Sequence, residues 1–175
     1  MNYYGAKDIA ESWRTVRKNT VQVAEDIPED KYSFKAAPDT MSVAEMLAHL
    51  ATSTHWAGEI HFTNKMSAVT IPDFQRLLGE AGKQSATLTS KAAIIDALKT
   101  RGEDFAKKIE TLSDAQLAET VTLPNGSKTR FEMLLGVKEH EMHHRAQLFQ
   151  IERMVGIVPH LTRARQQQQA AATAR

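Results

Sequence analysis

Apolar residues recur at three- and four-residue spacing in four separate stretches of the chain. In the first stretch Ile9, Trp13 and Val16 lie on one face, and the other stretches repeat this spacing. Because an α-helix turns by about 100° per residue, the spacing gathers apolar side chains on a single face. The pattern therefore predicts four long amphipathic helices, over about residues 6–26, 43–66, 91–112 and 129–154.

Capping residues mark where several of these helices begin and end. Ser42 with Glu45, and Thr129 with Glu132, have the spacing of a capping box, in which each side chain satisfies a free backbone donor. Gly156 follows the last stretch and is typical of a helix C-terminus. The second and fourth helices are therefore expected to begin at these boxes.

The connections between the helices differ in character. Residues 67–88 are irregular, with a short helix expected over Asp73–Glu80, and could form a long crossover that shapes a pocket mouth or a plain surface connection. Residues 119–127 alternate polar and apolar positions and then carry a tight-turn sequence, which indicates a small hairpin. Residues 161–175 are rich in Gln and Ala, have few large apolar groups, and are expected to be loosely ordered.

Length and composition favour an ordinary globular protein. The 175 residues fit one domain, which we expect to be an all-α domain over residues 1–160 followed by the tail. The net charge of +1 gives no electrostatic case for binding nucleic acid or an anionic membrane. The chain has no cysteine, so metal ligands would have to be His or carboxylates. No secretion signal or membrane-length apolar run is recognised, so a cytoplasmic location is expected.

Histidines gather in the fourth predicted helix, at His140, His143 and His144. On a helix His140 and His144 lie about 40° apart and one turn from each other, both toward the apolar face. His143 lies about 60° to the other side of His140, at the edge of that face. Burying two imidazoles is costly unless their nitrogens find partners, and one metal ion could satisfy both. The alternative is a pair of core histidines bonded to the backbone or to each other.

A metal site needs a further ligand from another part of the chain. His49, beside the apolar stripe of the second predicted helix, is the best candidate, and His160 and Glu45 are the alternatives. Ser53 and Trp56 lie one and two turns beyond His49 and could line a cavity. Three imidazoles with one open position favour zinc or nickel, with iron as a further option. Water in the open position would ionise more readily.

The sequence His140-Glu141-x-x-His144 also matches a zinc-protease motif in which the Glu is a general base. The extended form of that motif has a third His shortly afterwards, whereas here the next one is His160. Glu141 also lies about 100° from His140 on the helical wheel. The context therefore argues against a protease, and Glu141 and His143 are kept as candidate catalytic residues.

The remaining histidines and one arginine have other expected roles. His55 is expected to be a solvated surface residue, and His61 to pack within the protein or to support a ligand from behind. Arg145 points away from the predicted metal on the wheel and is expected to serve the structure or an interface.

Two segments carry a resemblance to a known family. His140 to Leu148, with Gly156 and Pro159 after it, resembles the closing helix of the DinB superfamily (DinB/YfiT-like), and Ser42 to Leu50 resembles its second helix. The resemblance implies a four-helix bundle with a long crossover connection, often dimeric. It also implies a divalent metal site formed by the residues that match the family's ligands: His49, His140 and His144. Ala146 departs from the pattern, because the family commonly has Gly there.

The family's activities set the functional expectation. Characterised members include transferases and isomerases that use low-molecular-weight thiols such as bacillithiol, mycothiol or glutathione. The resemblance therefore implies a metal-dependent, thiol-dependent S-transferase or isomerase that acts on a small molecule, as a homodimer. A metal-dependent hydrolase and a non-catalytic, metal-stabilised binding module are the alternatives.

Overall fold

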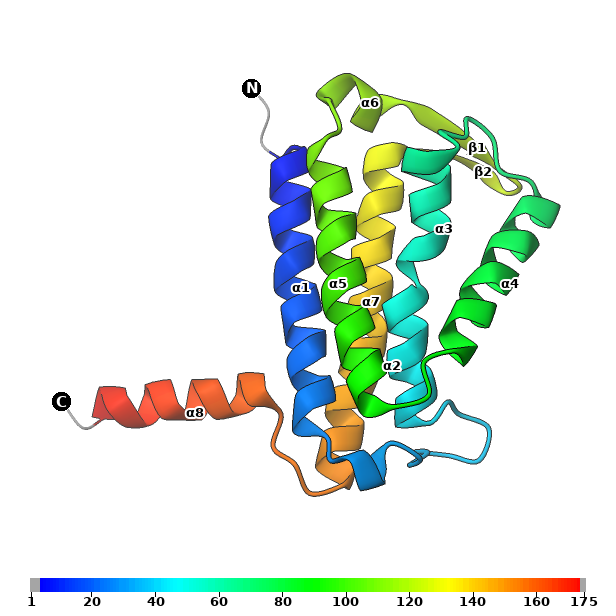
Figure 1. Cartoon of the computed structure of the whole chain (residues 1–175). Helices are drawn as coiled ribbons and strands as arrows, with labels where there is room; N and C mark the ends of the chain where they lie inside the picture. Colours follow the sequence, from blue (N-terminus) through cyan, green and yellow to red (C-terminus); the bar gives the residue numbers. More distant parts are fainter. Residues whose placement is uncertain (1–3, 174–175) are drawn as a thin grey trace.

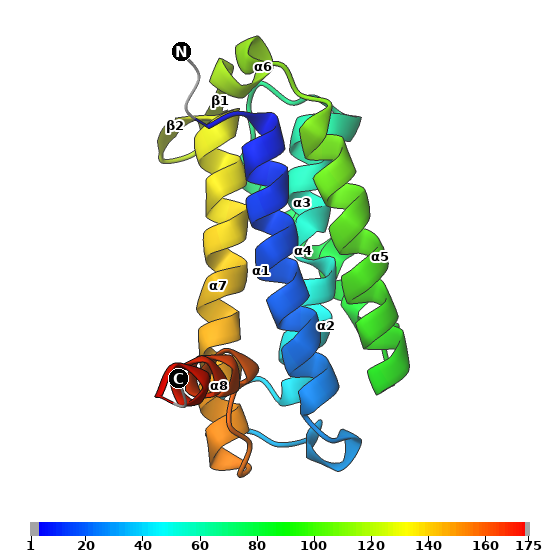
Figure 2. The same cartoon turned by 90° about the vertical axis from the view of Figure 1, so that its left-hand side faces the viewer.

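The computed structural model describes residues 4–173, and within them four helical columns lie side by side as a bundle (Figures 1 and 2). The second column is made of two consecutive helices. The columns are α1 (Ala6–Asp26), α2 (Val43–Thr52) with α3 (Thr54–Gly58), α5 (Lys91–Glu110) and α7 (Arg130–Met154). The all-α bundle predicted from the sequence is confirmed. None of the described helices is both long enough and apolar enough to cross a membrane.

Shorter elements connect the columns and cover one side and one end of the bundle. A 3-10 turn (Glu29–Lys31) follows α1, and a π-helical turn (Glu59–Thr63) follows α3. The crossover carries α4, and a two-stranded hairpin leads into α7. Their bounds are α4 (Ile71–Ala86), α6 (Asp114–Ala118), β1 (Thr120–Leu123), β2 (Gly126–Thr129) and α8 (His160–Thr173).

The predicted hairpin is present and is held by the crossover. The Val69 amide donates to the Thr122 carbonyl at 2.8 Å, and the Thr122 amide donates to the Ser67 carbonyl at 2.9 Å. Val121 is fully buried, in a cluster with side chains from three other segments. Two strands alone are marginal, so these contacts explain why the hairpin forms here.

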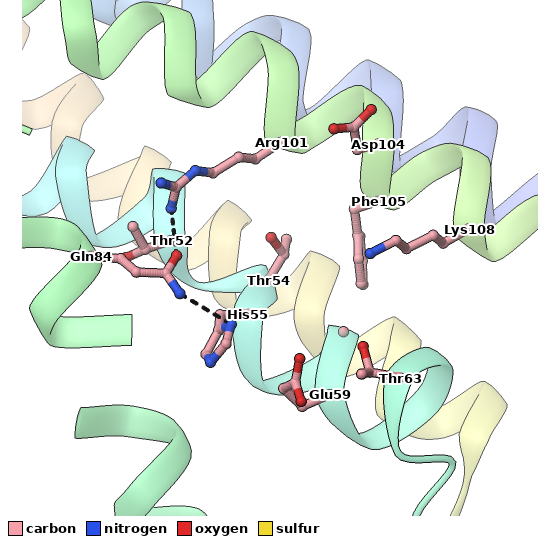
Figure 3. Close-up of a pocket in the computed structure, with 11 residues that line it drawn as sticks. Thr52, Thr54, His55, Glu59, Thr63, Gln84, Arg101, Asp104, Phe105 and Lys108 are labelled. Carbon is pink, nitrogen blue, oxygen red and sulfur yellow. Dashed lines mark hydrogen bonds between the residues drawn. The ribbon is translucent and has the colours of Figure 1, made fainter. Parts of the chain in front are cut away.

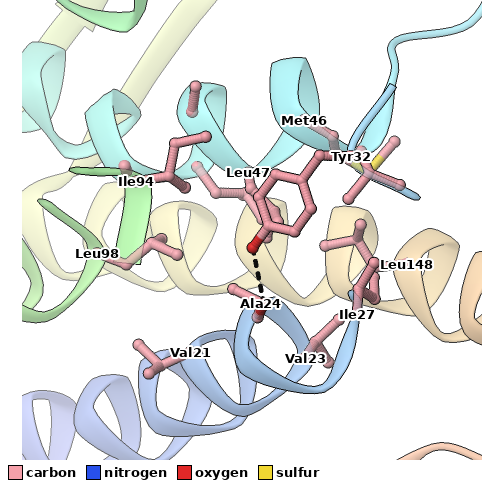
Figure 4. Close-up of a cluster of buried hydrophobic side chains, with 14 of the residues drawn as sticks. Val21, Val23, Ala24, Ile27, Tyr32, Met46, Leu47, Ile94, Leu98 and Leu148 are labelled. Carbon is pink, nitrogen blue, oxygen red and sulfur yellow. Dashed lines mark hydrogen bonds between the residues drawn. The ribbon is translucent and has the colours of Figure 1, made fainter. Parts of the chain in front are cut away.

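The main hydrophobic core lies where the four columns meet. Val23, Leu47, Leu98 and Leu148 come one from each column and are almost completely buried in a single cluster (Figure 4). Tyr32 belongs to the same cluster and donates its hydroxyl to the Ala24 carbonyl at 2.7 Å (Figure 4). The core therefore holds α2 and α7 at a fixed separation, and these are the helices that carry the predicted ligands.

Two helices differ from their predicted lengths. The helix predicted over residues 43–66 is interrupted at Ser53, because the Thr52 hydroxyl donates to the Ala48 carbonyl and the Ser53 hydroxyl to the Leu50 carbonyl. Such bonds compete with the helical amide ladder. The crossover helix, predicted over Asp73–Glu80, is longer, because its inner face is buried against the bundle.

The helix α8 runs away from the bundle, roughly across its long axis (Figures 1 and 2). Its first turns are attached to α1, since Arg163 pairs with Asp26 at 2.6 Å and His160 bonds Asn19 at 3.2 Å. None of the residues of α8 is buried, and its Gln and Ala residues are good helix formers. The division of the chain into a domain and a tail at residue 160 stays a prediction.

Candidate metal centre

Three histidines converge where α2 faces α7. His49 comes from α2, and His140 and His144 come from successive turns of α7. One ring nitrogen of each lies within 4.8 Å of the others, and the Nε2 atoms of His49 and His140 are 3.1 Å apart. All three side chains are half-buried. The structure therefore brings together the three residues that the sequence nominated, in a group that could hold a divalent metal ion.

Burial keeps these imidazoles in the form that binds metals. Burial lowers the pKa of His140 to about 4, and the neighbouring His144 and His49 add to the shift. Burial also lowers the pKa of His49, assisted by His144, and that of His144. At neutral pH the three rings are therefore uncharged, and each can offer a nitrogen lone pair.

Gln147 orients one of the three rings. The His144 Nδ1 atom lies 2.9 Å from the side-chain oxygen Oε1 of Gln147, so Nδ1 carries the proton and donates it. The Nε2 lone pair of His144 is thereby left free to face the other two rings. The amide nitrogen of the same Gln147 lies 3.2 Å from the Nε2 atom of His143, which is exposed. His143 is thus connected to the cluster through Gln147.

A buried arginine joins all four columns behind the cluster. Arg17 of α1 is 4% exposed and forms an ion pair at 2.7 Å with Glu141 of α7, which is 0% exposed. The same guanidinium donates to the carbonyls of Leu50 in α2, at 3.0 Å, and Leu98 in α5, at 3.3 Å. It also lies 4.8 Å from the centre of the Trp13 ring. One side chain therefore has partners on each of the other columns.

This arginine is coupled to the cluster through neighbouring residues. Leu50 follows His49 in the chain, and Glu141 follows His140. The Arg17 contacts therefore fix the spacing between the two helices that supply the imidazoles. Burial raises the pKa of the Glu141 carboxyl, and the Arg17 guanidinium opposes that shift.

Glu141 does not have the position of the general base of a zinc protease. Glu141 faces α1 and is paired with Arg17, whereas a general base has to reach the reacting centre. Arg145 has the structural role expected of it, because it donates to the Val16 carbonyl of α1 at 3.3 Å. Arg17 was not among the residues predicted from the sequence, although its position one turn after Trp13, on the apolar face, indicates a buried side chain.

A cavity of about 540 Å³ opens beside two of the three histidines. His49 and His140 lie in its wall, and Ser53 and Trp56, the predicted lining residues, lie there as well. The opposite wall belongs to α4, so the crossover does shape a pocket. A second cavity, of about 470 Å³, lies on the His144 side of the cluster. The imidazole group therefore has space for small molecules on both sides.

A third hollow, of about 320 Å³, lies between α3 and α5 and is polar (Figure 3). Arg101 donates to the Gln84 side chain at 2.8 Å, and Gln84 lies 3.3 Å from the Nδ1 atom of His55. The Nε2 atom of His55 is bonded to Glu80 at 2.9 Å. The prediction of a solvated His55 is therefore wrong: its side chain is 19% exposed and helps to fix α4 against α3.

His61 and the two alternative ligands, Glu45 and His160, lie in contacts of their own. His61 is buried against Arg130, with 3.2 Å between the Arg130 Nη1 and His61 Nδ1 atoms, as the packing role predicted. Burial, assisted by Arg130, lowers the pKa of His61 to about 4. Glu45 accepts from the Ser42 amide in its capping box. His160 is bonded to α1, so neither alternative belongs to the three-histidine group.

The comparison with known proteins agrees with this geometry. The family model described as the DinB superfamily matches residues 12–148, a range that contains all three histidines. The chain belongs to the DinB superfamily. Ala146 stands where the family commonly has Gly. Its side chain is exposed, so it leaves the imidazole group undisturbed.

Similar DinB proteins are known from Bacillus. The uncharacterized protein YjoA of Bacillus subtilis is 32% identical over 143 residues, which cover 80% of this chain and 84% of YjoA. The crystal structure of YjoA, a DinB-like protein, matches with a TM-score of 0.66 at 29% identity and covers 85% of this chain and 92% of its own. A DinB-like protein from Bacillus cereus matches in fold with a TM-score of 0.70, at 17% identity over 90% of this chain and 97% of its own.

Proposed function

We propose that this protein is a divalent-metal-dependent enzyme that uses a low-molecular-weight thiol as an S-transferase or isomerase. The metal, zinc or nickel with iron as a further option, would be held by His49, His140 and His144. The observation that carries the proposal is the convergence of three uncharged imidazoles beside a cavity. Three protein ligands are the number found in catalytic sites, in which a further position stays open.

The protein's own residues prepare the site for this role. Gln147 fixes the ring of His144, and the Arg17–Glu141 pair fixes the separation of the helices. When bound, a divalent metal would supply positive charge that lowers the pKa of a thiol or of water. The choice of a thiol as cosubstrate rests on the family, and the cavity of about 540 Å³ is large enough for a small-molecule substrate.

Two competing functions have to be separated from this one. In a non-catalytic, metal-stabilised module the metal supports folding and no cavity is required. The cavity beside His49 and His140 therefore favours an enzyme. A metal-dependent hydrolase would use the same imidazoles with water in place of the thiol, and an assay has to distinguish it.

We further propose that the enzyme works in the cytoplasm as a homodimer. The dimer is supported by the family, whose members are often dimeric, and by exposed apolar side chains near the end of α7 and the start of α8. These side chains are Met154, Val158 and Leu161. Sedimentation of the purified protein tests this proposal, and a monomer at micromolar concentration would contradict it.

The test of the reaction is a thiol-transfer assay on metal-loaded protein. Bacillithiol, mycothiol and glutathione are each supplied with 1-chloro-2,4-dinitrobenzene. The thiolate sulfur bonds to the ring carbon, chloride leaves, and the thiol proton is released to buffer. We expect His144→Ala to lose turnover with little change in melting temperature, and Glu139→Ala, an exposed site on the same helix, to keep it.

Three outcomes contradict the proposal in different ways. Hydrolysis of ester or amide substrates, without thiol transfer by any of the three thiols, would assign the protein to the hydrolases. Unfolding of His144→Ala would indicate a metal that only stabilises the bundle. Thiol transfer that continues after metal removal would show that the reaction does not depend on a metal held by the three histidines.

A further inference from the structure

The cavity beside His49 and His140 has an uncharged and mostly apolar lining. Its apolar side chains come from α3 and α4, and its other polar groups are the hydroxyls of small residues. Beyond the two histidines, the lining residues are Thr52, Ser53, Trp56, Phe74, Leu78, Ala81, Gly82 and Ser85. Among these described residues there is no Lys, Arg, Asp or Glu. Away from the two histidines, a charged group of a ligand would therefore lose its water in this cavity without gaining an ion partner.

The neighbouring polar hollow gives the opposite environment within the same protein. Thr52 lines both spaces, but the hollow between α3 and α5 is bordered by Glu59, Arg101, Asp104 and Lys108 (Figure 3). Charged side chains are thus available a short distance away and are kept out of the histidine-lined cavity. This separation indicates that the cavity is suited to an uncharged group.

Two aromatic side chains belong to the lining of the cavity. The ring centres of Trp56 and Phe74 are 5.9 Å apart, and the ring planes are inclined at 44°. Phe74 is 37% exposed and Leu78, one turn further along α4, is 49% exposed. A ligand that covers these side chains would remove apolar surface from water, which is the main source of affinity in such pockets.

The apolar wall is held in place by polar contacts on a neighbouring face of α4. There Glu80 is bonded to His55 at 2.9 Å, and Gln84 contacts both His55 and Arg101. These bonds link α4 to α3 and to α5. The distance between the α4 wall and the histidine wall is therefore set before a ligand binds, which lowers the entropy cost of binding.

We propose that this cavity binds an uncharged aromatic or apolar portion of the substrate, packed against Trp56, Phe74 and Leu78. The reacting end of the same molecule then lies at His49 and His140. The assignment of a reaction at that end rests on the proposed function. The binding of the apolar portion depends only on the cavity and does not require a metal.

Two probes with one ring framework test the proposal. N-phenyl-1-naphthylamine is uncharged, and 1-anilinonaphthalene-8-sulfonate adds a negative charge to the same rings. Both become more fluorescent in apolar surroundings, so titration of the full-length protein gives two dissociation constants. We expect the uncharged probe to bind at least about tenfold more tightly, because the sulfonate would be desolvated without a cationic partner.

A matched pair of variants locates the binding site. Leu78→Asp places a carboxylate in the cavity wall, whereas Ile71→Asp introduces the same side chain on the same helix, outside the cavity. The parent side chains are 49% and 59% exposed, so both variants are expected to fold. We expect Leu78→Asp to weaken the uncharged probe at least about tenfold and Ile71→Asp to stay within about twofold of the parent.

The outcomes separate this inference from the proposed function. Equal affinity for the two probes, or equal binding by the parent and Leu78→Asp, overturns the inference. All titrations are repeated with EDTA, and metal content is measured on the same samples. A protein that binds the uncharged probe as expected but no metal would refute the proposed function and leave the apolar cavity established.

Discussion

Replacing Glu141 by Gln removes one charge from the buried ion pair with Arg17 and keeps nearly the same side-chain volume. Arg17 is 4% exposed and Glu141 is 0% exposed, so the guanidinium would remain in the interior without its counter-ion. Its bonds to the Leu50 and Leu98 carbonyls satisfy hydrogen-bond donors but do not neutralise the charge. Breaking a buried pair in this way costs about 3–5 kcal/mol. For a chain of this size the melting temperature should fall by roughly 6–20 °C.

A second arginine of α1, the helix that carries Arg17, forms an exposed ion pair that serves as a matched control. Arg14, one turn before Arg17, pairs with Glu103 of α5 at 2.9 Å, but the two side chains are 26% and 43% exposed. Glu103→Gln should cost about 0–1 kcal/mol, because water screens an exposed pair. The double variant Arg17→Met/Glu141→Met removes both buried charges and should be more stable than Glu141→Gln.

The assay is urea unfolding followed by circular dichroism, with zinc affinity measured on the same variants. Because Glu141 is adjacent to His140, we expect Glu141→Gln also to weaken zinc binding, and Glu103→Gln to leave it unchanged. If Glu141→Gln costs no more stability than Glu103→Gln, the buried pair does not hold α7 against α1, and the reasoning about the site's geometry fails.

Two further variants test other buried positions. In Gly102→Ala the new Cβ would lie 2.6 Å from Arg17 Cγ. Although Ala has the better helix propensity, we expect the free energy of unfolding, measured by thermal unfolding, to fall by about 1–3 kcal/mol. A stabilised variant would contradict the tight contact. Glu152 is 0% exposed, and burial, assisted by Asp26, raises its pKa from 4.5 to about 7. A raised pKa means that the folded state favours the protonated acid, so the parent protein loses stability as the pH rises from about 4.5 to about 7. Between pH 5 and pH 8 the stability of Glu152→Gln should therefore rise by on the order of 2–3 kcal/mol relative to that of the parent protein. Parallel stability curves for parent and variant over this range would show that Glu152 is not desolvated.

Local sequence signals were sufficient for much of the fold. The capping boxes at Ser42 and Thr129 mark the starts of α2 and α7, and Gly156 has the positive φ of 84° expected after a helix. Apolar periodicity located α1 and α5 to within a few residues. These features depend on neighbours a few positions away, and for that reason the sequence reveals them.

Contacts between distant segments could not be derived in the same way. The periodicity continues through Ser53, and only the bonds of its hydroxyl to the preceding turn show why α2 ends there. The Arg17–Glu141 pair joins residues from α1 and α7, and helical phase alone does not say which neighbouring helix a side chain meets. The partners of His55 lie on α4 and depend on where the crossover packs. The three-histidine group could be predicted because two imidazoles at the apolar face of one helix need partners for their nitrogens. A metal ion supplies such a partner, and it requires a further ligand from another part of the chain.

The central claim is that His49, His140 and His144 hold one divalent ion, and zinc titration of three proteins tests it most directly. The parent should bind one zinc per chain. His49→Ala should lose at least about tenfold in affinity, because one of three ligands is gone. His143→Ala, which removes an exposed histidine of the same run, should keep the parent's stoichiometry. Undiminished zinc binding by His49→Ala would contradict the claim.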